Sequence, residues 1–303
     1  MTQSVLTKDK LEQAIQFLGA QARPLEKLMY AYEFEDGSLE AVLEELANYQ
    51  NSDGGFGNAL EPDIRAAASS ALVTTVALQH LSHLGRGVDC KLVADAVRYL
   101  IDTYNEVQPN GWDIVPKEVE SAPRAPWWNY NAAHNGWGNP GIEIAGYLFE
   151  YADAVPPKLL DSITSYAIKH INEVSSRKDF HELLCCLRFA ERAPETVLLE
   201  VKPALDEMVK NCVTTDSKGW NAYCLMPLQV AENPESIYYG MLSDSVESNL
   251  AHMIEKQQSD GAWHPAWSWG QYEDTWIVAQ REWTGVITLD TLRKLHVYGA
   301  LEL

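Results

Sequence analysis

Long apolar runs, a net basic charge and a disulfide framework are all missing from this chain. No apolar run approaches the roughly 18–20 residues that a membrane span requires, so we expect no transmembrane segment. The formal net charge of -20 argues against nucleic acid as a partner, because phosphates attract a basic surface. The same charge disfavours electrostatic adhesion to anionic lipid.

Cysteine usage and the first residues favour a reducing compartment. The five cysteines are an odd, scattered set without the spacing of a disulfide framework. The opening stretch MTQSVLTKDKLEQ has neither the basic region nor the apolar region of a secretory signal. We therefore expect a cytoplasmic protein. Nucleotide-binding glycine loops and the Gly-x-Ser-x-Gly motif are also missing, and we expect no cofactor.

What the chain does contain is one short pattern written twice. YQNSDGGFG at 49–57 is matched by QQSDGAW at 257–263, with glutamine, serine, aspartate, glycine and an aromatic in the same order. Residues 39–49 and 246–257, which precede the two copies, carry apolar residues at helical spacing. Asp36 and Ser38 are candidate caps for the first helix. Glycine accepts the left-handed backbone that closes a helix, so each helix is expected to stop at its turn.

Weaker copies of the turn predict a repeat that fills the chain. Gly111-Trp112 and Gly219-Trp220 each end a further helical pattern. The aromatic residues of the four turns are Phe56, Trp112, Trp220 and Trp263. Their spacing implies a repeat of roughly 50 residues, which is typical of stacked helix pairs. Strand signals are nearly absent, and GVITLDTLRKL favours a helix capped at Thr288. We predict an all-α protein, an α/α toroid of about six helix pairs that forms a single domain over residues 1–303.

The Gln-x-x-Asp-Gly-x-aromatic unit resembles the glutamine–tryptophan repeat of squalene–hopene and related terpenoid cyclases. The β subunits of protein prenyltransferases share that repeat. The resemblance is sharp over 46–57 and 253–263 and implies a toroid of inner and outer helices around a central cavity. In such a barrel Gln50 and Gln257 would hydrogen-bond backbone at neighbouring helix ends, and the aromatic would stack into the join. These turns are therefore expected to be structural, and function is expected elsewhere.

The segments that follow the turns are the better candidates for a ligand site. In a toroid the crossings at 58–65, 124–143 and 264–276 should gather on one rim, where helix N-termini present free N–H groups. Six of the ten tryptophans lie in two of these crossings. Aromatic loops on a rigid scaffold commonly bind small molecules. The substrate-binding candidates are Trp127, Trp128, Tyr130, His134, Asn135, Trp137, Glu143, Trp267, Trp269, Tyr272 and Trp276.

Carboxylates accompany these aromatics and are the catalytic candidates: Glu61, Asp63, Glu273 and Asp274. A carboxyl group pressed among tryptophans has its charged form desolvated, which raises its pKa and makes it a plausible acid near neutrality. A structural alternative is that Asp63 and Asp274 cap the helices that follow them.

Three functions remain open. The resemblance implies a cyclase-like enzyme on an isoprenoid or similar amphipathic small molecule, in which a protonated aspartate starts a cationic reaction and aromatic rings stabilise the cation. The Asp-x-Asp-Asp motif of the cyclases is missing, however. Polar loops such as NYNAAHN suit sugar hydroxyls instead, so a carbohydrate-active α/α-barrel enzyme is an alternative. A non-catalytic binding toroid is the third.

A metal site is not expected. The prenyltransferases hold zinc with Asp, Cys and His, and their Asp-x-Cys spacing is missing here. His181 and Cys185 are one helical turn apart and could contact a metal together, but a core histidine and thiol are the simpler interpretation.

Overall fold

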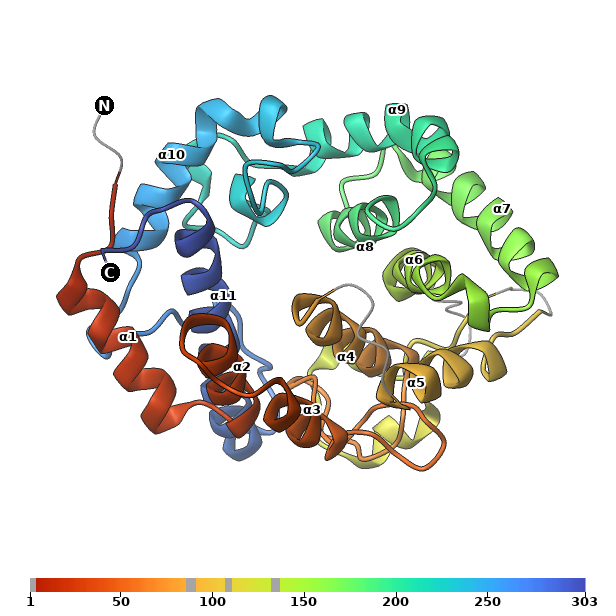
Figure 1. Cartoon of the computed structure of the whole chain (residues 1–303), viewed down its shortest axis with the longest axis horizontal. Coiled ribbons are helices and arrows are strands. Elements are labelled where there is room, and N and C mark those ends of the chain that lie inside the picture. The colour runs from red at the N-terminus through yellow and green to blue at the C-terminus, as the bar shows by residue number, and fades with distance from the viewer. Residues whose placement is uncertain (1–3, 86–90, 107–110, 132–136, 303) are drawn as a thin grey trace. The chain divides into compact units, whose positions relative to one another are not determined.

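The computed structural model describes residues 4–85, 91–106, 111–131 and 137–302. These residues form helices, turns and loops, and their only β-type pairings are isolated bridges (Figure 1). The all-α prediction is therefore confirmed for the described chain. It divides into two compact units, which we call the terminal unit (Met1–Glu45 with Val213–Leu303) and the middle unit (Leu46–Cys212). Toroid closure and the single domain stay predictions.

The middle unit alternates two kinds of helix. Helices α4, α6 and α8 follow one another in contact, and α5, α7 and α9 pack against them. Most of α4 and nearly all of α6 is buried, whereas α7 buries one stripe, at Ile163, Ala167, Ile171 and Val174. The six helices are α4 (Ala71–His83), α5 (Lys91–Asp102), α6 (Ile142–Glu150), α7 (Pro157–Val174), α8 (Phe180–Ala190) and α9 (Glu195–Cys212).

The terminal unit brings the two ends of the chain together. Leu6 donates its N–H to the carbonyl of Ala300 at 2.9 Å, and Glu302 donates to Leu6 at 3.0 Å. Helix α11 packs on α1 and α2, where the Arg293 guanidinium binds the Glu33 carboxylate with an Nε–Oε2 distance of 2.6 Å. Its helices are α1 (Lys8–Gln21), α2 (Pro24–Phe34), α10 (Tyr239–Glu255) and α11 (Glu273–Val297), and α3 (Leu39–Ala47) continues into the middle unit.

Eleven α-helices lie in the described ranges, one fewer than six full pairs. Between α9 and α10 the chain forms only short 3-10 turns, Ser217–Gly219 and Pro227–Gln229. Ser38 caps α3 as predicted, because its Oγ accepts the Ala41 N–H at 3.3 Å. The predicted cap at Thr288 is wrong, because α11 begins at Glu273 and Thr288 lies inside it.

The glutamines of the two sharp repeat turns make the same pair of hydrogen bonds. Gln50 donates from its amide to the carbonyls of Gly54 (2.9 Å) and Leu92 (3.0 Å), the latter in the first turn of α5. Gln257 donates in the same way to Gly261 and to Lys10 in the first turn of α1, both at 2.8 Å. Each glutamine thus joins its turn to a neighbouring helix, as the sequence predicted.

The glycines are required by the backbone of the same turns. Gly54 and Gly261 have φ angles of 90° and 87°, which favour glycine. A Cβ atom at position 54 would lie 2.4 Å from the carbonyl oxygen of Asp95, and one at position 261 would lie 2.5 Å from that of Gln13. The preceding helices end earlier than predicted, at Ala47 and Glu255, so glycine closes the turn and not the helix.

The two turns also share contacts that the sequence comparison did not predict. The backbone N–H of Phe56 donates to Thr74 Oγ1 at 3.0 Å, and that of Trp263 donates to Thr288 Oγ1 at 3.1 Å. Each threonine lies on the helix that follows its turn. A buried N–H without an acceptor costs about 1–3 kcal/mol, so the threonines are part of the repeat.

Candidate functional site

Two of the three predicted loops lie side by side within the middle unit. Ala125 donates its N–H to the Asp63 carbonyl at 2.9 Å, and Arg65 donates to Pro123 at 3.1 Å. Ile64 forms an isolated bridge with Arg124 between these two bonds. The segment 58–65 is thereby fixed against the start of the tryptophan-rich segment 121–131.

Arg124 organises the second of these loops from inside. Its buried guanidinium binds the Glu120 carboxylate at 2.8 Å and the Asn129 side-chain oxygen at 2.8 Å. Glu120 also accepts the Tyr130 N–H at 2.8 Å. A planar guanidinium with several donors can satisfy many loop carbonyls at once, and here it also contacts those of Val119 and Ala122.

The two acidic side chains of the first loop are buried. Asp63 is 3% exposed and Glu61 is 7% exposed. Neither caps α4, because the N-cap of that helix is Ser70, whose side chain accepts the Val73 N–H. The capping interpretation of Asp63 is therefore wrong.

The backbone just before these carboxylates is strained. Asn58 and Ala59 have φ angles of 54° and 63°. Alanine has no side-chain polar group to compensate for a left-handed conformation, which costs about 1–3 kcal/mol per residue. Such strain is concentrated at functional sites more often than elsewhere.

The aromatic candidates of the second loop differ in exposure. Trp127 is 47% exposed, whereas Trp128 and Tyr130 are half-buried. The ring of Trp137 is buried in the core of the middle unit, with its centroid 5.9 Å from that of Trp112. His134 and Asn135 lie outside the described residues.

Glu143 is the centre of a buried polar cluster on α4, α6 and α8. Its carboxylate is 2% exposed and accepts hydrogen bonds from Gln79 (2.7 Å), Tyr147 (3.2 Å) and Arg188 (3.1 Å). Cys185 Sγ donates to it at 3.6 Å. Burial, and next the Glu143 charge, raise the pKa values of Tyr147 and Cys185, so both stay protonated near neutrality.

The third predicted loop, 264–276, belongs to the terminal unit and carries three tryptophans. Trp269 and Trp276 are buried against each other at 5.5 Å between centroids. Trp267 is half-buried, edge-on to Trp283 at 5.2 Å and near the exposed Tyr223 at 6.1 Å.

The acidic candidates of this third loop are exposed, unlike those of the first. Tyr272, 44% exposed, is the N-cap of α11, and Glu273 and Asp274 lie in the first turn of that helix. The capping interpretation of Asp274 is wrong, although a carboxylate in the first turn still interacts favourably with the helix dipole.

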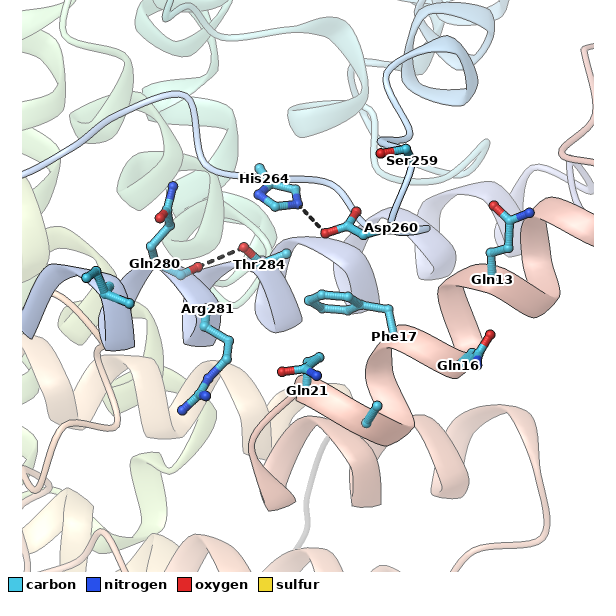
Figure 2. Close-up of a pocket in the computed structure, with 12 residues that line it drawn as sticks. Gln13, Gln16, Phe17, Gln21, Ser259, Asp260, His264, Gln280, Arg281 and Thr284 are labelled. Atoms are coloured by element: carbon cyan, nitrogen blue, oxygen red, sulfur yellow. Dashed lines mark hydrogen bonds and ion pairs between the residues drawn. The ribbon is translucent and has the colours of Figure 1, made fainter.

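A groove that the sequence did not predict as a site lies between α1 and α11 (Figure 2). It encloses about 610 Å³, and the turn of the second repeat borders it. Its α1 residues follow helical spacing and carry no charge, which is the signal that sequence reasoning missed. The lining residues are Gln13, Gln16, Phe17, Ala20, Gln21, Ser259, Asp260, His264, Ile277, Gln280, Arg281 and Thr284.

No group of three or more metal-binding side chains is found among the described residues. Cys185 contacts Glu143, while the His181 backbone N–H donates to Asp179, the N-cap of α8. No helix in the described ranges has the length and apolar composition for crossing a membrane. Comparison of the chain with models of protein families, with characterised proteins and with solved structures finds no match.

Proposed function

We propose that the protein is a terpenoid-cyclase-like enzyme that acts on an isoprenoid or similar amphipathic small molecule, with Asp63 as the acid. The observation that carries the proposal is the burial of Asp63 in a strained loop fixed against the tryptophan-bearing segment 121–131. Between the two aspartates considered, Asp63 is favoured because Asp274 is exposed to solvent. A proton donor in a water-poor place acts on its substrate without competition from solvent.

In the proposed reaction, the Asp63 carboxyl group transfers its proton to an alkene carbon of the substrate. The alkene π electrons form the new C–H bond and leave a cation at the neighbouring carbon. A second alkene then donates its π electrons to close a ring. The final cation loses a proton to a base, for which Glu61 in the same loop is the candidate. Glu61 then releases this proton to solvent, and solvent returns a proton to Asp63. The rings of Trp127 and Trp128 would stabilise the cation by about 0.5–2 kcal/mol each.

The proposal includes closure of the helix pairs into a ring and a cytoplasmic location. Closure is supported by the glutamine bonds, because Gln257 joins its turn to α1 at the beginning of the chain just as Gln50 joins its turn to α5. The location is supported by the scattered cysteines, of which the four described are free thiols.

A carbohydrate-active enzyme is the second candidate, and the Glu143 cluster favours it. Gln79 and Arg188, half-buried, surround a buried carboxylate on three adjacent helices. Hydroxyl-rich substrates are bound by such combinations of donors and acceptors. Glu61 and Asp63 would then serve as the acid and base pair that glycosidases use.

The test is an activity screen with matched aspartate variants. The full chain is incubated with squalene, with linear polyprenols and with nitrophenyl glycosides, and products are followed by mass spectrometry and absorbance. Asp63→Asn should lower turnover by about 100-fold or more, since general acid catalysis contributes 10²–10⁴-fold, while Asp274→Asn keeps full activity. Cyclised polyprene products support the cyclase, and glycoside cleavage supports the second candidate. Equal activity of Asp63→Asn and the unaltered chain would refute the role of Asp63, and no turnover of any probe would favour a binding protein.

A further inference from the structure

We propose that the groove between α1 and α11 is a binding site for a short neutral oligosaccharide. The site lies within the terminal unit and uses none of the residues of the proposed reaction. Its volume of about 610 Å³ falls in the usual range of small-molecule sites. The inference rests on three observations, namely the chemistry of the lining, the absence of partners in the described chain for its glutamine side-chain amides, and a comparison of the two repeats.

The lining is rich in neutral amides. Gln13, Gln16 and Gln21 reach it from α1 and Gln280 reaches it from α11 (Figure 2). None of the four side-chain amides has a hydrogen-bond partner within the chain as the structure describes it. An amide offers two donors and an acceptor, and a sugar hydroxyl is both donor and acceptor. Four free amides along one groove therefore suit a row of hydroxyl groups.

The apolar part of the lining suits the carbon face of a sugar ring. The Phe17 ring projects from α1 toward α11 (Figure 2). Ile277, which is 66% exposed, lines the groove from α11. Phe17 is half-buried, so part of its ring remains accessible from the groove. An aromatic ring combined with amides is able to bind a molecule that has apolar C–H faces and polar edges.

Charge favours a neutral ligand. The acidic side chain of the lining, Asp260, is already paired with His264, with a distance of 2.8 Å between Oδ2 and Nε2. Arg281 is exposed and has no ion pair in the described chain, so its guanidinium can donate to hydroxyls. The net charge of -20 repels anions at long range, whereas the guanidinium of Arg281 repels a cation inside the groove.

The first repeat provides a matched comparison for α1. Lys10 and Leu92 are equivalent, because their carbonyls accept the hydrogen bonds from Gln257 and Gln50. Counted from these two residues along the helices, Gln13 corresponds to Asp95 and Gln16 corresponds to Arg98. In the first repeat these positions pair with each other, because Arg98 binds Asp95 with an Nη2–Oδ1 distance of 3.0 Å. The equivalent helix positions thus form an ion pair in the middle unit, whereas in the terminal unit they carry amides without a hydrogen-bond partner in the described chain.

The other side of the groove exists in the second repeat alone. Thr74 is the fourth residue of α4, whereas its equivalent Thr288 is the sixteenth residue of α11. Helix α11 therefore extends further at its N-terminal end, and this extension carries Ile277, Gln280 and Arg281. The fold of the repeat does not require these residues, which favours a separate role for the groove.

The experiment measures binding of maltotriose, cellotriose, xylotriose and chitotriose to the full chain by saturation-transfer NMR and calorimetry. We expect at least one to bind. Phe17→Ala should weaken that binding about tenfold, and Gln280→Ala about three- to tenfold, as lost stacking and hydrogen-bond energies imply. Gln280→Ala removes an amide without partners in the described chain, so the variant folds even if Phe17→Ala does not.

The matched control is Arg98→Ala in the first repeat, which should leave the dissociation constant unchanged within about twofold. Trialanine serves as a peptide probe of similar length. Absence of binding for all four saccharides, or binding of trialanine alone, would overturn the proposal. It would also be overturned if saccharide binding were unaffected by Gln280→Ala, or were weakened equally by Arg98→Ala.

Discussion

Replacement of Gln50 or Gln257 by alanine tests whether the two sharp turns are equivalent structural ties. Each side chain donates two hydrogen bonds, one within its turn and one to the first turn of a neighbouring helix. Alanine removes both bonds and leaves a cavity where the amide was. Neither substitution removes a glycine from a left-handed position or changes the net charge, so the effect on stability reports the lost hydrogen bonds and the cavity.

The magnitude follows from the number of bonds. A hydrogen bond contributes about 1 kcal/mol net, so each variant should lose about 2 kcal/mol of unfolding free energy. In a chain of 303 residues that corresponds to about 3 °C in the midpoint of thermal unfolding. The two ties share no partner and lie in different units, so the double variant should lose about 4 kcal/mol.

The assay is urea and thermal unfolding, followed by far-UV circular dichroism and tryptophan fluorescence. The control is Gln258→Ala, whose exposed side chain donates to the Lys256 carbonyl, and it should change stability by less than about 0.5 kcal/mol. A loss for Gln257→Ala as small as that of the control would refute the tie. A difference above about 1.5 kcal/mol between Gln50→Ala and Gln257→Ala would refute the equivalence of the turns.

Two further predictions concern the backbone and the thiols. Gly261→Ala should cost about 3 kcal/mol, because a Cβ atom would meet backbone, whereas Gly270→Ala, with a similar sign of φ but open space around it, should cost about 1 kcal/mol; equal losses in calorimetry would contradict this. Burial raises the pKa of Cys185, so at pH 8 iodoacetamide should alkylate it on the order of 100-fold more slowly than the half-buried Cys224, as peptide mass spectrometry can measure. Similar rates would show that the Glu143 cluster opens readily.

Much of the helical organisation could be predicted from the residues alone. The repeat of glutamine, aspartate and glycine predicted two similar turns, and Gln50 and Gln257 make matching bonds. The turns depend on residues a few positions apart, on the conformational freedom of glycine and on helical spacing, all of which are read directly from a sequence. The bonds from Gln50 to Leu92 and from Gln257 to Lys10 join distant parts of the chain, and they were expected from the family resemblance.

Other local predictions failed where helix ends were concerned. Thr288 was expected to begin a helix, but α11 starts much earlier, and Ser70 caps α4 in place of Asp63. Helix ends are decided by small differences in free energy between capping partners, so tertiary contacts readily shift them. The roles of Thr74 and Thr288 as acceptors could not be seen either, because each lies many residues from its donor.

The sequence by itself determined the helices, the turns that join them and the list of aromatic and acidic side chains. Only the tertiary structure decided that Asp63 is buried whereas Asp274 is exposed, and that the first and last helices form a groove. The physical reason is the distance along the chain over which each interaction acts. Turn geometry is set by hydrogen bonds and backbone angles among near neighbours, whereas the burial of a carboxyl group depends on side chains that approach it from distant parts of the chain.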